Sequence, residues 1–228
     1  MKHYSIAIDG PAGAGKSTIA KRTAKKLGFL YVDTGAMYRA LALYFIRQGI
    51  SADEEDRIAG VLDGADVSIA YEDGTQQVYL NRENVSGLIR TEEVSQMTSA
   101  TSRYAAVRSK LLQLQRKLAK EADVVMDGRD IGTFVLPDAD LKIYMTAGSR
   151  ERAKRRFLEL TEQGIPCNIE EIEKGIIERD ERDMNREIAP LAQAEDAVLL
   201  DTSAMSVEEV ADAVLAMFRE KTAGGERA

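Results

Sequence analysis

The chain has 228 residues, a formal net charge of −7, one cysteine and one histidine. The single cysteine excludes an internal disulfide and a thiolate metal cluster, and the single histidine, His3, argues against a catalytic histidine or a histidine-rich metal site. The negative charge gives no general attraction to nucleic acids or anionic membranes. The apolar runs are short, the first ending at Asp9, so we expect a cytoplasmic protein without a membrane span or secretory signal.

The first expected strand, residues 4–9, leads through a glycine-rich loop into a helix over residues 16–27. The loop matches the pattern G-x-x-x-x-G-K-[ST] and reads Gly10, Pro11, Ala12, Gly13, Ala14, Gly15, Lys16, Ser17, Thr18. Backbone N–H groups of such a loop bind a polyphosphate, the lysine reaches its β- and γ-phosphates, and the Ser17 hydroxyl is a ligand for Mg²⁺. A chance match is disfavoured, because strand, loop and helix occur in the required order. The loop predicts a nucleoside triphosphate and Mg²⁺ but leaves the reaction open.

A strand over residues 29–32 and a helix over residues 36–48 follow, and Gly49 is placed to cap that helix. Residues 67–71 and 76–80 then flank the sequence Glu72-Asp73-Gly74-Thr75, which predicts a β-hairpin. Because a hairpin interrupts the alternation of strand and helix, we interpret residues 62–95 as an inserted module.

An amphipathic helix is predicted by apolar residues spaced three and four apart: Tyr104, Val107, Leu111, Leu114 and Leu118. Arg108 lies beside this stripe, so we expect it to point inward. The next strand, residues 124–127, ends in Asp127. Such a strand delivers its last carboxylate to the edge of the sheet beside the phosphate loop, where a ligand for Mg²⁺ or its water is needed. A turn aspartate before Gly128 is the alternative.

A fourth strand, residues 141–146, precedes a basic helix start whose cations are Arg150, Arg152, Lys154, Arg155 and Arg156. These cations lie near the expected phosphates, but a solvated basic helix face explains them equally well. A nucleic-acid surface is disfavoured, since no aromatic residues interleave them.

In the helix predicted over residues 169–186, the stripe of Ile169, Ile172 and Ile176 continues as polar residues: Arg179, Asp183 and Arg186. An inward arginine needs an anion, and Asp183 can orient both neighbours, although a solvated helix end with ion pairs stays open. A strand over residues 197–200 and a final helix, opened by a capping box of Ser206 and Glu209, complete the alternation. The alternation predicts an α/β fold with a parallel sheet flanked by helices.

Several stretches together resemble the bacterial cytidylate kinases, a family of nucleoside monophosphate kinases. They are IDGPAGAGKST (8–18), VDTGAMYRAL (32–41), VSGLIRTEEV (85–94), MDGRDIGT (126–133), the basic helix (150–156), ERDERDMNR (178–186) and APL (189–191). The phosphate loop is common to many families, whereas the second, fourth and sixth stretches together are far more specific.

The resemblance implies a P-loop kinase fold, with a five-stranded parallel sheet, an inserted monophosphate-binding module that contains a small β-hairpin or sheet, and a short lid. It implies one kinase domain over residues 1–228, a monophosphate-binding region near 36–110 with its β insert at 62–95, and a lid near 150–186. The implied reaction converts ATP and CMP or dCMP to ADP and CDP or dCDP with Mg²⁺, in pyrimidine nucleotide metabolism, carried out by a cytoplasmic monomer.

The resemblance also implies roles for individual residues. Residues 10–18 bind ATP, and the residues expected to act on the transferring phosphoryl group are Lys16, Arg152, Arg155 and Arg156. The acceptor phosphate is assigned to Tyr38, Arg39 and Arg129, with Thr34 lining the same pocket. Cytosine recognition falls to Ser99, Arg108, Asp130 and Arg186, and ribose contact to Arg179 and Asp183.

Two other interpretations stay open. A kinase for UMP, shikimate or dephospho-coenzyme A would use the same loop but would not need Asp130 together with Arg108 and Arg186. A carboxylate suits the N4 amino donor of cytosine, whereas uracil would present an acceptor oxygen to it. A nucleotide-dependent switch or sensing module is a different class, and the sequence lacks the N-K-x-D guanine motif of GTPase switches.

Overall fold

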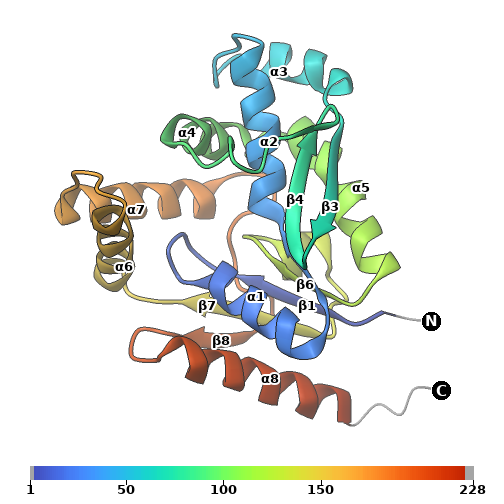
Figure 1. Cartoon of the computed structure of the whole chain (residues 1–228), viewed down its shortest axis with the longest axis vertical. Helices are drawn as coiled ribbons and strands as arrows, with labels where there is room; N and C mark the ends of the chain where they lie inside the picture. Colours follow the sequence, from blue (N-terminus) through green and yellow to red (C-terminus); the bar gives the residue numbers. More distant parts are fainter. Residues whose placement is uncertain (1–2, 224–228) are drawn as a thin grey trace. The chain divides into compact units, whose positions relative to one another are not determined.

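Figure 1 shows the computed structural model, which describes residues 3–223. These residues form two compact units. The sheet unit contains residues 3–31 and the chain from residue 123 onward, and the insert unit contains residues 32–122. Within the described part of the chain, no helix has both the length and the apolar character needed to cross a membrane.

The sheet unit is built on a five-stranded sheet with the strand order β2-β6-β1-β7-β8. The strands are β1 (Ser5–Asp9), β2 (Leu30–Asp33), β6 (Val124–Asp127), β7 (Leu141–Thr146) and β8 (Val198–Asp201), and β2 carries the chain into the insert unit. Ile8 of β1 lies in parallel register with Asp127 on one side and Ile143 on the other. The predicted parallel sheet is therefore confirmed, with every strand within one residue of its expected limits.

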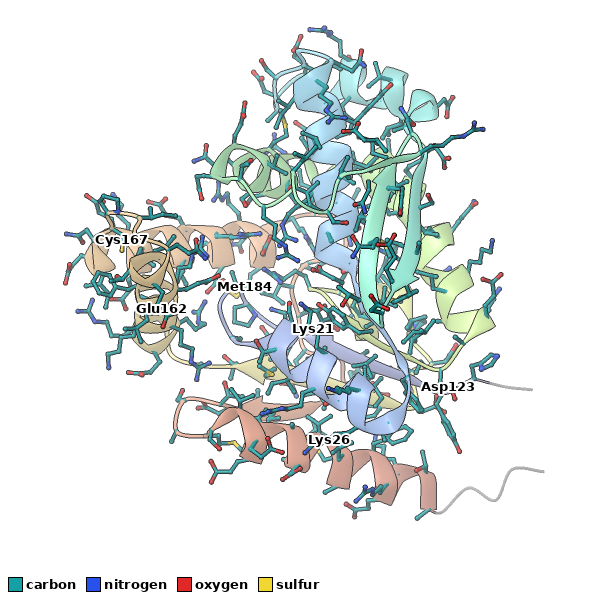
Figure 2. The ribbon with its side chains drawn as sticks, viewed as in Figure 1. Lys21, Lys26, Asp123, Glu162, Cys167 and Met184 are labelled. Atoms are coloured by element: carbon teal, nitrogen blue, oxygen red, sulfur yellow. The ribbon has the colours of Figure 1, made fainter. Side chains whose placement is uncertain are left out.

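The helices of the sheet unit are α1 (Lys16–Leu27), α6 (Ser149–Glu162), α7 (Ile169–Asn185) and α8 (Val207–Ala223), with a short π-helical turn, η2 (Ile131–Val135). Helices α1 and α8 pack against the strands, whereas α6 and α7 pack mainly against each other. Helices α1 and α8 pack side by side (Figure 1), and Lys26 of α1 pairs with Glu208 and Asp212 of α8 (Figure 2). The predicted capping box is present at α8, since Glu209 N–H donates to the Ser206 hydroxyl and Ser206 N–H donates to the Glu209 carboxylate.

The insert unit combines helices with a three-stranded antiparallel sheet in the order β3-β4-β5. Its elements are α2 (Thr34–Arg47), α3 (Glu55–Val61), η1 (Leu62–Gly64), β3 (Val67–Glu72), β4 (Thr75–Leu80), β5 (Glu83–Asn84), α4 (Glu92–Thr101) and α5 (Ala105–Glu121). The predicted hairpin is confirmed, and both central residues of its turn, Asp73 and Gly74, have the positive φ that a tight hairpin turn requires. The buried side of α5 includes Arg108 and Leu111 as expected, but Gln115 rather than Leu118.

Candidate functional site

The phosphate loop joins β1 to α1 and curls around the ammonium group of Lys16. Gly10, Gly13 and Gly15 all have positive φ, and a Cβ at Gly10 would collide with the carbonyl oxygen of Met145. The Lys16 ammonium is buried and donates to the carbonyl oxygen of Pro11 at 2.7 Å. Burial, and next the nearby guanidinium of Arg129, hold the pKa of Lys16 well below its ordinary value of 10.5. The protein's own acidic groups do not offset these two effects. A polyphosphate bound at this loop would supply the negative charge that stabilises the Lys16 ammonium.

The structure brings Ser17 and Asp127 together at the start of α1. The Ser17 hydroxyl donates to Oδ2 of Asp127 at 2.7 Å, and the Tyr31 hydroxyl donates to Oδ1 at 3.0 Å. One hydroxyl and one carboxylate suit Mg²⁺, which takes oxygen ligands and fills most positions with water and substrate phosphates. Among residues 3–223 no group of three or more His, Cys, Asp or Glu side chains could hold a metal ion. The donor set therefore fits an ion that arrives with a polyphosphate rather than one held in a protein cage.

The three arginines expected near the transferring phosphoryl group occupy different environments on α6. Arg152 is buried, donates to the carbonyl oxygen of Ala12 at 3.0 Å and pairs with Asp180 at 2.6 Å. Arg155 donates to the carbonyl oxygen of Ala14 at 3.3 Å and to that of Thr202 at 2.8 Å. Arg156 is exposed and pairs with Glu159 one turn along the helix at 2.8 Å. Arg152 and Arg155 thus contact the phosphate loop, whereas Arg156 faces outward.

A buried cluster of alternating charge forms in the sheet unit between α7 and the chain after β6. Arg129 donates to Asp183 at 3.0 Å, and Arg186 lies 3.6 Å from Asp130 and 3.9 Å from Asp183. Burial raises the pKa of Asp183, but the guanidinium groups of Arg129, Arg179 and Arg186 outweigh it and hold that pKa below 3.8. The inward turn of Asp183 and Arg186, predicted from helical spacing, is confirmed. Asp183 is held as a carboxylate that orients two arginines.

The insert unit carries Thr34, Tyr38, Arg39, Ser99 and Arg108. Thr34 opens α2 and is buried, and the guanidinium of Arg108 lies 5.6 Å from the centre of the Tyr38 ring. Arg108 is only 3% exposed, so its expected inward orientation is confirmed. The buried hydroxyl of Ser99 has no hydrogen-bond partner among the described residues. Tyr38 and Arg108 therefore form a contact, and Ser99 supplies a polar atom able to bind a ligand.

Asp33 and Arg90 also take part in these contacts, although the sequence did not predict a role for either residue. Asp33 caps α2 by accepting from Ala36 N–H at 2.9 Å, and its carboxylate lies 3.9 Å from Arg39 and 3.4 Å from Arg90. The sequence feature that could have identified Asp33 is its position directly before α2, the helix that carries Arg39. Arg90 lies within VSGLIRTEEV, one of the stretches that carry the resemblance, but the resemblance implies no role for it.

Asp9 was also missed, although it ends β1 directly before the phosphate loop. Its two carboxylate oxygens accept from the backbone N–H groups of Ile131 and Gly132 at 2.8 and 2.7 Å. Burial raises the pKa of Asp9 from 3.8 to about 7, against the lowering effect of these two hydrogen bonds. The strand before the phosphate loop is thereby fastened to the segment that follows Arg129 and Asp130.

Comparisons with known proteins show the family of this chain. The family model described as cytidylate kinase matches residues 6–220. A cytidylate kinase of Caldicellulosiruptor saccharolyticus is 51% identical over 218 residues, covering 96% of each chain. That of Desulfitobacterium hafniense is 47% identical over 224 residues, covering 98% of this chain and 96% of its own.

Among solved structures, a gluconokinase from Sinorhizobium meliloti is similar with a TM-score of 0.50 and 14% identity, covering 98% of this chain and 95% of its own. An uncharacterized protein from Eubacterium ventriosum reaches a TM-score of 0.53 at 12% identity, covering 95% and 98% of the two chains. At such low identity these two likenesses establish the fold alone.

Proposed function

The chain belongs to the cytidylate kinase family and transfers a phosphoryl group from ATP to CMP or dCMP, and we propose how its own side chains divide that work. The observation that carries the proposal is the contact of a buried lysine, a hydroxyl and a carboxylate with one phosphate loop, alongside a buried arginine–aspartate cluster. Phosphoryl transfer needs positioning and charge neutralisation rather than a histidine base, which suits this composition.

ATP is bound by residues 10–18, whose backbone N–H groups and Lys16 ammonium take the β- and γ-phosphates. Ser17 and Asp127 would hold Mg²⁺, which when bound supplies further neutralisation of phosphate charge. The 2.7 Å hydrogen bond between these two side chains supports this pairing, because it already places both oxygens at one point beside the loop.

Arg152, Arg155 and Arg156 are assigned to the transferring phosphoryl group, with Lys16. Arg152 and Arg155 donate to carbonyl oxygens of Ala12 and Ala14, so they hold the loop in shape as well as adding positive charge beside it. Arg156 can contact the transferring phosphoryl group only if its ion pair with Glu159 breaks. We therefore assign it the smallest contribution of the three arginines to phosphoryl transfer.

Recognition of CMP is assigned to both units. In the sheet unit, Asp130 accepts from the N4 amino group of cytosine, Arg186 donates to its acceptor atoms, Arg129 binds the acceptor phosphate, and Arg179 and Asp183 contact the ribose. In the insert unit, Tyr38, Arg39 and Thr34 serve the acceptor phosphate, and Ser99 and Arg108 serve the base. The 3.6 Å approach of Arg186 to Asp130 supports the cytosine assignment, because it places a donor and an acceptor side by side.

A panel of acceptors tests this function. ADP release is measured with ATP and Mg²⁺ alone and after adding CMP, dCMP, UMP, AMP, shikimate or dephospho-coenzyme A. CMP and dCMP should give the fastest release, and release without acceptor should be slow. Faster turnover of UMP or AMP would overturn the cytosine assignment, and acceptor-independent release would favour a nucleotide-dependent switch.

We further propose that the enzyme acts in the cytoplasm, where both of its nucleotide substrates are available, and that one chain is the active unit. Light scattering during size-exclusion chromatography gives the mass of the active species. A mass near 25.1 kDa would agree, and a stable dimer would contradict it.

A further inference from the structure

Asp127 receives hydrogen bonds on both of its carboxylate oxygens from different elements. Ser17, at the start of α1, donates to Oδ2, and Tyr31, in β2, donates to Oδ1 at 3.0 Å. Asp127 ends β6, the strand next to β2 in the sheet. The Tyr31 hydroxyl therefore contacts the oxygen of Asp127 that does not accept from Ser17.

The Tyr31 ring is itself held in place. Its residue is only 8% exposed and belongs to the apolar cluster of the sheet unit. The ammonium of Lys21, which projects from α1 (Figure 2), lies 5.5 Å from the ring centre, within the range of a cation–π contact. Burial and this contact restrict the orientations of the ring and therefore of its hydroxyl.

The terminal torsion of an aspartate side chain is broad, so the carboxylate plane is set by whatever its oxygens bind. A hydrogen bond to one oxygen fixes that plane and directs the other oxygen. Groups that orient a metal-binding carboxylate in this way change metal affinity by about 10- to 100-fold when they are removed. The Tyr31–Asp127 contact has the geometry and the burial for such a role.

We propose that Tyr31 is a positioning residue for the divalent cation that accompanies ATP: its hydroxyl fixes the Asp127 carboxylate so that Oδ2 faces the Ser17 hydroxyl and the cation. This inference rests on the proposed role of Asp127 in holding Mg²⁺. It gives a polar function to a residue whose ring otherwise fills the core of the sheet unit.

A structural role alone is the competing explanation, since a buried tyrosine hydroxyl needs some acceptor. Tyr104 supplies a matched control, because it is 6% exposed and its hydroxyl donates to the backbone carbonyl oxygen of Ala52 at 2.8 Å. That hydroxyl also accepts from Arg103 at 3.0 Å, so its loss removes two hydrogen bonds, both in the insert unit and neither to a carboxylate.

The test compares the full-length wild type with Tyr31→Phe, Tyr104→Phe and Asp127→Asn. ATP binding is measured by calorimetry, first with EDTA and then over a series of Mg²⁺ concentrations, and each variant's thermal unfolding is recorded. For Tyr31→Phe we expect the Mg²⁺ concentration for half-maximal enhancement of ATP binding to rise about 10-fold, with ATP affinity in EDTA unchanged. Tyr104→Phe should match the wild type in both.

The outcomes separate the two claims. If Asp127→Asn alters the Mg²⁺ response but Tyr31→Phe does not, Tyr31 has no positioning role and the inference fails. If Asp127→Asn leaves the Mg²⁺ response unchanged, the proposed metal role of Asp127 fails first. Equal weakening of ATP binding with and without Mg²⁺ in Tyr31→Phe would also overturn the inference, as a purely structural effect. Should Tyr31→Phe not fold, Tyr31→Met, which lacks the hydroxyl and adapts to irregular space, is measured in its place.

Discussion

The carboxylate of Asp9 accepts the backbone N–H of Gly132 at 2.7 Å, which fastens the strand before the phosphate loop to the segment after Asp130. A second bond from Ile131 N–H uses the other carboxylate oxygen. Both backbone donors are buried, so removing their acceptor leaves them unsatisfied. One side chain thus ties the loop assigned to ATP to the segment assigned to the acceptor.

Asp9→Asn should destabilise the fold at acidic pH, because an amide has one oxygen where the carboxyl group has two. Leaving one buried N–H without an acceptor costs about 1–3 kcal/mol. Urea unfolding at pH 5 should show a loss of that size. Full stability of the variant at that pH would mean that the two hydrogen bonds contribute little.

The same pair of proteins should show a pH-dependent difference in stability. Burial raises the pKa of Asp9 to about 7, so the folded state binds a proton more tightly than the unfolded state does. The stabilisation is complete below pH 4 and is lost as the pH rises towards 7. The advantage of the wild type over Asp9→Asn should therefore shrink between pH 4 and 8, by up to about 4 kcal/mol. A constant difference across this range would contradict the raised pKa.

Lys16→Met should abolish most phosphoryl transfer without unfolding the protein. The ammonium is buried and its pKa is lowered mainly by burial, so its charge does not stabilise the fold, and methionine fills similar space. Loss of one charged group at the reacting phosphates should lower kcat by about 10²- to 10³-fold. Coupled ADP assays and urea unfolding measure the two effects. Near-normal turnover in a folded variant would remove Lys16 from the mechanism.

Asp130→Asn should narrow the preference for CMP over UMP. The amide can donate to O4 of uracil, whereas the carboxylate can only accept. We expect the ratio of kcat/KM values to fall by about 10- to 100-fold, mostly through loss of activity on CMP. Lys16→Met is the control, since it should slow both substrates alike. An unchanged ratio would place base recognition elsewhere.

The sequence predicted those features whose signal is local. The phosphate loop, with Lys16 and Ser17, is a contiguous motif, and the inward turn of Asp183 follows from helical spacing. Contacts between distant residues carry no such signal. The folded sheet brings Asp9 to Gly132 and Tyr31 to Asp127, and the packing of α6 on α7 brings Arg152 to Asp180. The elements α3 and β5 could not be predicted for a different reason. With seven and two residues, they are too short to show the hydrophobic periodicity of a helix or a strand.

Arg152→Ala and Arg156→Ala should have unequal effects, although both remove one arginine from the same helix. Arg152 is buried against Ala12 and Asp180, so its loss frees the phosphate loop and leaves Asp180 buried without its cation. Arg156 is exposed and pairs only on the helix surface with Glu159, an interaction of about 0.3–0.5 kcal/mol. We expect Arg152→Ala to raise the KM for ATP, lower kcat and lower the unfolding midpoint in urea. We expect Arg156→Ala to stay within about threefold of the wild type in both kinetic constants.

The two variants control for each other because both lose one positive charge from α6. If only the general positive charge near the phosphates mattered, both variants would be slowed equally. A loss of kcat in Arg156→Ala as large as in Arg152→Ala would show that Arg156 leaves Glu159 and reaches the transferring phosphoryl group.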